Sequence, residues 1–197
     1  MLLYWAPKTR SFTALWMLEE SGLPYERELV DIREPERSPR FLEVNPMGKV
    51  PSLEDGAARL AEQAAICAYV AERAGGDTLA PSAGDPLRGR YFHWLFFAAT
   101  CIEAAFAEKF TGLKLPTTQA GWGDAAKVFR VLDQLVAAGP WVLGEKFSAA
   151  DVMIGSGLNF GVLFKAIEAT PAIDAYLARC RARPAFQRAT AIDEAGI

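Results

Sequence analysis

The stretch Asn45–Leu53, which reads NPMGKVPSL, decides how the first part of the chain folds. Within and after it, Val50–Glu54 is a strand candidate, Asp55-Gly56 is a hairpin turn signal, and Ala58–Leu60 returns as a second strand. A helical face then follows, formed by Ile66, Tyr69, Val70 and Arg73 and closed by Gly75-Gly76. This order predicts a hairpin and a helix at the end of a small sheet.

The residues before this stretch add a strand, a helix and a further strand. Leu2–Trp5 is a short apolar run, and Tyr25–Val30 is polar enough for an edge strand. The helix between them is predicted from a helical period; Thr9 or Ser11 can cap its start and Gly22 its end. Strands alternating with helices predict a mixed α/β domain over residues 1–75.

Helical signals alone follow a linker at residues 76–84. Asp85-Pro86 opens a long amphipathic stretch, and Pro116-Thr117-Thr118 opens a second helix. Ser148–Asp151 has the form of a capping box before an apolar helix, and two shorter helices begin at Thr170-Pro171 and Arg183-Pro184. We therefore expect an all-helical domain over residues 85–197.

Composition excludes several classes of function. The net charge is −3, from 21 basic and 24 acidic residues without a basic stripe, so nucleic acid is not an expected partner. The longest uncharged apolar run, Trp94–Ile102, is far shorter than the roughly 20 residues that span a bilayer, so no membrane association is expected. Three scattered cysteines and one histidine, His93, do not form a metal-ligand pattern, so we expect no metal.

Three segments together resemble the soluble, bacterial-type glutathione transferase family: Trp16–Glu26, Asn45–Leu53 with Glu62–Tyr69 after it, and Phe147–Val152. They lie in the family's order across almost the whole chain. The resemblance implies a thioredoxin-like N-terminal domain followed by an all-α domain. It also implies glutathione as co-substrate, a small apolar electrophile as second substrate, a homodimer, a cytoplasmic location and a role in detoxification.

The resemblance also assigns the glutathione-binding residues. It implies that Pro51 is cis, that the Val50 backbone pairs with the tripeptide like an added strand, and that Lys49 lies beside it. Glu62 and Gln63 open the next helix, where the helix N-terminus attracts the γ-glutamyl carboxylate and Glu62 takes the ammonium. The family usually has Ser at position 63, so a side-chain contact from Gln63 is the less certain part. Read singly, Pro51 is an ordinary edge proline and Glu62 an exposed first-turn carboxylate.

The thiolate needs a donor at the start of the first helix. Lowering a thiol pKa by two units takes about 2.7 kcal/mol. A hydroxyl donor to a charged group supplies about 1.5–3 kcal/mol, and a helix N-terminus about 0.3–1 kcal/mol. Ser11 is our first candidate, Thr9 the second and Tyr4 the third, with a plain helix cap as the alternative for Ser11. The cysteine position of the beta class falls on Arg10, which could steer glutathione or stabilise charge on the electrophile.

The helical half offers pocket candidates. Glu103 stands where the beta class has a histidine, and Phe97 and Thr100, with Phe96 and Phe106, could wall the electrophile pocket. A plain core stripe is the alternative for the aromatic residues. The predicted function is glutathione transfer to a small hydrophobic electrophile. A non-catalytic interaction module, or a glutathione-dependent reductase, isomerase or dehalogenase, are the alternatives.

Overall fold

The computed structural model describes residues 1–196. The chain forms two compact units, one made of Met1–Gly75 together with the chain from Arg183 onward, the other of Gly76–Ala182. The last helix, which we expected within the helical domain 85–197, belongs instead to the first unit. Among the described residues, no helix is long and apolar enough to cross a membrane.

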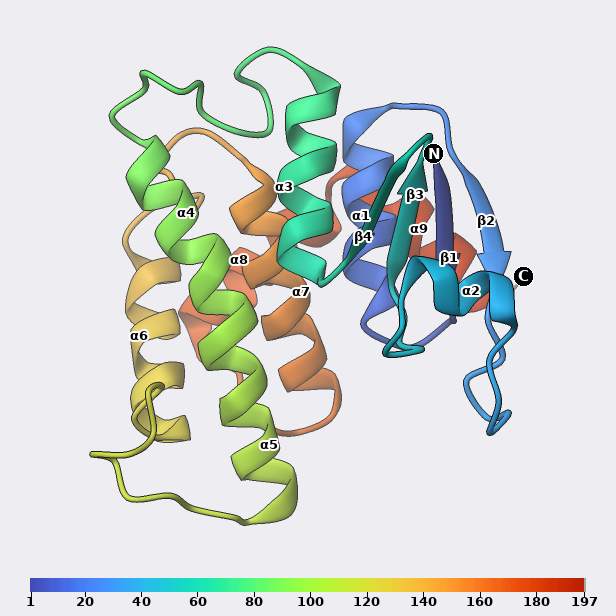
Figure 1. The fold of residues 1–197 in the computed structure, drawn as a ribbon. Coiled ribbons are helices and arrows are strands. Elements are labelled where there is room, and N and C mark those ends of the chain that lie inside the picture. The colour runs from blue at the N-terminus through green and yellow to red at the C-terminus, as the bar shows by residue number, and fades with distance from the viewer. Residues whose placement is uncertain (197) are drawn as a thin grey trace. The chain divides into compact units, whose positions relative to one another are not determined.

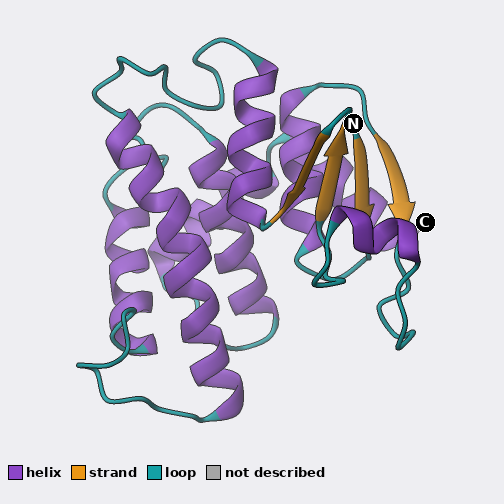
Figure 2. Ribbon diagram, viewed as in Figure 1, coloured by secondary structure: helices purple, strands orange, loops and turns teal. Residues whose placement is uncertain are grey.

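The first unit is built on a four-stranded mixed sheet (Figures 1 and 2). The strands are β1 (Leu2–Trp5), β2 (Glu26–Leu29), β3 (Ser52–Asp55) and β4 (Ala58–Ala61), in the order β2-β1-β3-β4. β2 runs parallel to β1, whereas β3 and β4 are antiparallel to their neighbours. All four residues of β2 are exposed, as predicted for an edge strand. The hairpin between β3 and β4 turns at Gly56, whose φ of +60° a glycine adopts without strain.

Helices cover both faces of this sheet. They are α1 (Ser11–Ser21), α2 (Pro39–Val44), α3 (Gln63–Ala74) and α9 (Pro184–Ala195). Phe41 of α2 packs on Tyr4, with the ring centroids 5.2 Å apart. Strand residues alternate between faces, so the fully buried Leu3 points to the opposite face, where α1 packs against both α3 and α9. This mixed sheet with helices on both faces is the thioredoxin-like domain predicted from the sequence.

The second unit is all-helical. Its helices are α4 (Arg88–Phe97), the π-helical turn η1 (Ala98–Ile102), α5 (Glu103–Thr111), α6 (Ala125–Ala137), α7 (Ala149–Leu163) and α8 (Pro171–Arg181). The predicted start of a helix at Pro116 is wrong. α6 begins at Ala125, because the Asp124 carboxylate accepts a hydrogen bond from the Lys127 N–H at 2.8 Å and caps the helix there.

The predicted capping box opens α7 and is part of a larger buried network. The Ser148 N–H donates to the Asp151 carboxylate at 2.9 Å. The fully buried Asp151 side chain also accepts from the Val142 N–H at 2.8 Å and the Tyr176 hydroxyl at 2.9 Å. Burial raises the pKa of Asp151 to about 6, although each of these donors acts in the opposite direction. One carboxylate thus joins the start of α7 to a loop and to α8.

Candidate functional site

The Asn45–Leu53 loop is organised by one buried amide. Asn45 is 4% exposed, and its Nδ2 donates to the Lys49 carbonyl at 2.7 Å while its Oδ1 accepts from the Met47 N–H at 3.0 Å. The Ser52 hydroxyl donates to the same Lys49 carbonyl at 3.0 Å. These short-range bonds close the loop on itself, so the following residues are held in a defined conformation.

The peptide bond between Val50 and Pro51 is cis, as the sequence analysis predicted. Val50 is half-buried and lies two positions before Ser52, the first residue of β3. Within residues 1–196, no hydrogen bond uses the Val50 backbone N–H or C=O. A backbone donor and acceptor left unpaired beside a strand can add one residue of an extended peptide to the sheet.

The start of α3 forms a second unpaired backbone group. Glu62 is its N-cap residue and has a φ of +69°, which is uncommon for a residue other than glycine. The Glu62 side chain makes no capping hydrogen bond to the first turn of α3. The N–H groups of Gln63 and Ala64, together with the helix dipole, therefore suit an anion, and the exposed Glu62 carboxylate beside them suits a cation.

The hydroxyls at the start of α1 bond to each other and to the backbone. The Thr9 hydroxyl donates to the Ala6 carbonyl at 2.7 Å, and the Thr9 and Ser11 oxygens are 3.0 Å apart. The Ser11 Oγ accepts from the Ala6 N–H at 3.2 Å, and the Thr9 Oγ1 accepts from the Ser11 N–H at 3.1 Å. Arg10, rather than Thr9 or Ser11, is the N-cap residue of α1. The two hydroxyls close the turn that leads from β1 into α1.

This hydrogen-bonding pattern argues against Ser11 as the group that contacts a sulfur. Ser11 is fully buried, and its Oγ accepts a hydrogen bond from the Ala6 N–H and lies against the Thr9 Oγ1, so the side chain is enclosed within the turn. Tyr4 is also removed from the list. Its side chain is buried against α2, its hydroxyl donates to Glu54 at 3.4 Å, and burial raises its pKa. Thr9, which is partly exposed, is the remaining hydroxyl candidate.

Two basic side chains flank Thr9. Lys8 is exposed and Arg10 is half-buried, and both stand at the positive end of the α1 dipole. Their charges and the helix dipole favour an anion in front of this turn. The steering role expected of Arg10 thus stays a prediction.

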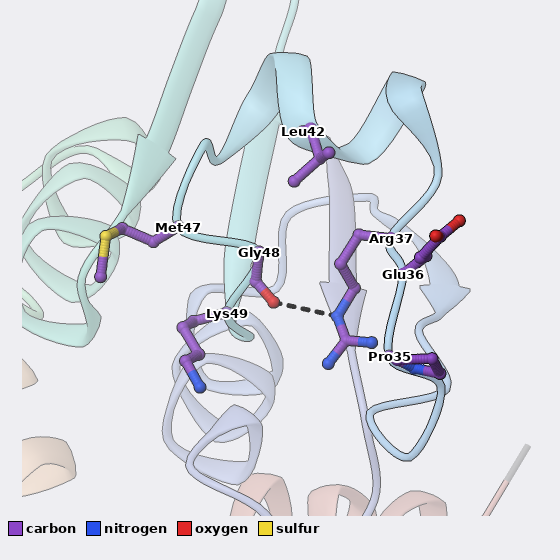
Figure 3. A pocket seen from close by; sticks show the side chains of 7 residues that line it. All are labelled: Pro35, Glu36, Arg37, Leu42, Met47, Gly48 and Lys49. Atoms are coloured by element: carbon purple, nitrogen blue, oxygen red, sulfur yellow. Dashed lines mark hydrogen bonds between the residues drawn. The ribbon is translucent and has the colours of Figure 1, made fainter.

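Sequence reasoning missed Arg37, whose guanidinium joins the Asn45–Leu53 loop to the segment after β2 by hydrogen bonds. Figure 3 shows the Arg37 Nε–H donating to the Gly48 carbonyl, at 3.1 Å. Its Nη groups donate to the Asp31 and Ile32 carbonyls, both at 3.2 Å. A cavity of about 510 Å³ lies here, lined by Arg37, Gly48, Lys49, Pro35, Glu36, Leu42 and Met47. Arginine in a loop carries no local pattern that would have predicted this role.

In the second unit, the predicted pocket residues lie on consecutive turns. Phe97 ends α4, Thr100 is exposed in the π-helical turn η1, and Glu103 begins α5. The Thr100 hydroxyl donates to the Phe96 carbonyl at 2.9 Å. Phe106 is buried and packs in the core, so it does not wall a pocket. A π-helical turn inside a long helix is often found at functional sites.

Comparison with known proteins gives the family. Residues 10–73 match the family model described as the glutathione S-transferase N-terminal domain. The chain is 30% identical to glutathione S-transferase hmp2 of Hypomyces subiculosus, over 88% of this chain and 90% of that protein. It is 26% identical to the disulfide-bond oxidoreductase YfcG of Escherichia coli (strain K12), over 95% of this chain and 93% of that protein.

Solved structures agree with this assignment. A sphingomonad glutathione S-transferase complexed with glutathione matches with a TM-score of 0.82 and 29% identity, covering 98% of this chain and 99% of that one. The structure contains three features that the resemblance implied: the mixed sheet, the cis Val50-Pro51 bond and the all-helical second unit. The chain therefore belongs to the glutathione S-transferase family.

Proposed function

We propose that the protein binds glutathione in an extended conformation against Val50 and joins glutathione through its sulfur to a small apolar electrophile. The observation that carries the proposal is the unpaired Val50 backbone next to the uncapped start of α3. An extended tripeptide needs a backbone partner at its centre and a carboxylate site at one end. Both are provided by one rigid domain.

The two ends of glutathione would meet different groups. The γ-glutamyl carboxylate would accept hydrogen bonds from the Gln63 and Ala64 N–H groups, and the ammonium would pair with Glu62. The glycyl end would lie toward Lys49, whose exposed ammonium borders the cavity beside Gly48. The Gln63 side chain is longer than the serine usual in the family, so we expect the backbone to carry most of the carboxylate binding.

For thiol activation, we propose that Thr9 acts where Ser11 was first expected. The Thr9 hydroxyl would turn from the Ala6 carbonyl to the sulfur, with Arg10 and the α1 dipole adding positive potential. The thiol proton then goes to solvent, the sulfur lone pair forms a C–S bond, and the leaving group departs with the bonding electron pair. The pKa of the glutathione thiol decreases only modestly, because the Thr9 hydroxyl gives up its hydrogen bond to the Ala6 carbonyl when it donates to the charged sulfur.

The family supports a proposal for the second substrate and the setting. We propose that Phe97, Thr100 and Glu103 contact the electrophile, and that the protein works as a homodimer in the cytoplasm, in detoxification. The fold requires no metal for this reaction, since the thiolate itself is the nucleophile.

A glutathione-dependent disulfide reductase is the second candidate. It is favoured by the internal hydrogen bonds of Thr9 and Ser11, which leave the thiol weakly activated, because the nucleophilicity of a thiolate falls with its pKa and thiol–disulfide exchange gains only partly from a lowered thiol pKa. In that reaction two glutathione thiols reduce one disulfide, which yields glutathione disulfide and two thiols. The relative named disulfide-bond oxidoreductase supports this candidate.

Calorimetry with glutathione, followed by two turnover assays, tests the proposal. We expect heat of binding at millimolar glutathione or below, and turnover of chlorodinitrobenzene that exceeds turnover of hydroxyethyl disulfide. Glu62→Gln should weaken glutathione binding, while Glu72→Gln, in the same helix, serves as the matched control. Faster disulfide reduction would favour the second candidate. The absence of glutathione binding would reject both enzymatic candidates and, together with the absence of turnover, would favour the non-catalytic interaction module.

A further inference from the structure

Lys8 has an unusual backbone conformation at the turn into α1. Its φ is +56°, in the left-handed region that residues with a side chain rarely adopt. Its N–H donates to the Asp193 Oδ1 at 3.0 Å, across 185 positions of sequence. Because the conformation is costly, a contact that holds the Lys8 N–H in place decides how the turn is set.

Several other polar groups of this turn are bonded within it. The Ala6 carbonyl and N–H are used by Thr9 and Ser11, and the Thr9 carbonyl accepts from the Phe12 N–H at 3.2 Å. The bond from Lys8 leaves the turn and ends on α9. Asp193 therefore links the turn to a second element of the same unit.

α9 is a firmly anchored support for this contact. Arg183 forms two hydrogen bonds to Glu20, at 2.6 and 2.7 Å, and the Glu20 side chain is only 6% exposed. Arg188 pairs with Glu19 at 2.6 Å, and Phe186 packs edge-on against Trp16 with centroids 4.9 Å apart. Ten residues of helix separate Arg183 from Asp193, which is about 15 Å at 1.5 Å per residue. An anchor at one end thus fixes the carboxylate at the other.

We infer that Asp193 is a positioning residue for the thiolate of glutathione. It holds the Lys8 N–H and thereby fixes the turn that carries Thr9 and Arg10. The inference rests on the proposed function, in which these two residues stabilise the thiolate. Asp193 touches neither glutathione nor the reacting atoms, so its role is exerted through the turn. Through Asp193, α9 would influence the pKa of the bound glutathione thiol.

The hydrogen bond and the charge of Asp193 have opposite effects on the thiolate. The bond orders the turn, whereas a negative charge near the turn disfavours a second anion. Lys8 and Glu194 are the charged groups that act on this carboxylate, and burial is the main reason that its pKa is raised. Asp193→Asn keeps an oxygen acceptor without the charge, so it separates the two effects from Asp193→Ala, which removes both.

Two measurements test the inference with matched variants. The first is amide hydrogen exchange at Lys8 without glutathione, and the second is the pKa of the bound glutathione thiol from its ultraviolet thiolate absorbance. In Asp193→Ala we expect Lys8 exchange to accelerate about 10-fold or more and the thiol pKa to rise by about half a unit or more, from the loss of one hydrogen bond. Asp193→Asn should restore most of the protection of the Lys8 amide and return the thiol pKa to the wild-type value or slightly below it, because the acceptor stays and the charge is gone. Glu194→Ala removes a neighbouring exposed carboxylate and should change neither exchange nor thiol pKa by a comparable amount.

The outcomes separate this inference from the proposed function. Absence of glutathione binding in the wild type would reject the proposed function, and Lys8 exchange would still report whether the contact exists. Normal glutathione binding, with faster Lys8 exchange but an unchanged thiol pKa in Asp193→Ala, would overturn the inference alone. Unchanged Lys8 exchange in Asp193→Ala would overturn it as well.

Discussion

The two hydroxyls at the start of α1 give the sharpest prediction, because Thr9→Val should raise the pKa of the bound thiol whereas Ser11→Ala should lower stability and leave that pKa unchanged. Ser11→Ala leaves the Ala6 N–H without its 3.2 Å acceptor in a buried turn. An unsatisfied buried donor costs about 1–3 kcal/mol, so stability should fall by that amount. The pKa of bound glutathione should stay close to the wild-type value, because the Ser11 hydroxyl is buried inside the turn.

Thr9→Val removes the hydroxyl that we assign to the thiolate. A hydrogen bond to a charged group contributes about 1.5–3 kcal/mol, and about 1.36 kcal/mol corresponds to one pKa unit. The gain on binding is smaller because Thr9 gives up its bond to Ala6, at about 1 kcal/mol. The pKa of the bound thiol should therefore rise by about 0.5–1.5 units in Thr9→Val.

Thermal unfolding and titration of the ultraviolet thiolate absorbance measure these two effects on the same samples. A rise in thiol pKa in Ser11→Ala, with no rise in Thr9→Val, would refute the assignment. It would also restore the sequence-based preference for Ser11.

Three further predictions concern the scaffold. Asn45→Ala should weaken glutathione binding at least about 10-fold in calorimetry, because the Lys49 carbonyl loses its 2.7 Å donor and the loop before Val50 is released; unchanged binding would contradict this. Since the pKa of Asp151 is raised from 3.8 to about 6, the folded state holds that proton more tightly than the unfolded state. The free energy of unfolding should thus fall by about 3 kcal/mol between about pH 4 and 6, a slope that denaturant titrations should not find in Asp151→Asn. Arg183→Ala leaves the mostly buried Glu20 carboxylate without its cation and should destabilise the first unit by about 3–5 kcal/mol, with Arg181→Ala as the exposed control; equal melting temperatures of the two variants would refute the anchoring role.

Local signals predicted the elements that depend on local chemistry. Gly22 ends α1 with a φ of +65°, Gly56 turns the hairpin, and the box formed by Ser148 and Asp151 opens α7. Each of these is a backbone requirement met by residues a few positions apart, so the sequence pattern suffices. Pro51 needed the family resemblance, because most prolines after another residue are trans.

What the sequence could not predict depends on contacts between distant residues. Nothing local in Arg183–Phe186 indicates that this helix packs on α1 rather than within the helical unit, because its partners Glu20 and Trp16 lie more than 160 residues away. Ser11 was favoured because it supplies a hydroxyl at the start of the first helix, and no local pattern showed that its side chain is buried and accepts a hydrogen bond from the Ala6 N–H. The start of α6 was misplaced because Pro116-Thr117 and Asp124 are both good helix starts.

The central claim is that glutathione pairs with the Val50 backbone, and titration of glutathione into the isotope-labelled protein tests it most directly. The account predicts that the Val50, Gln63 and Ala64 amide resonances shift together and saturate at millimolar glutathione or below, while the Ser148 amide, bonded within the second unit, stays in place. Saturating binding that leaves the Val50 amide unshifted would contradict it.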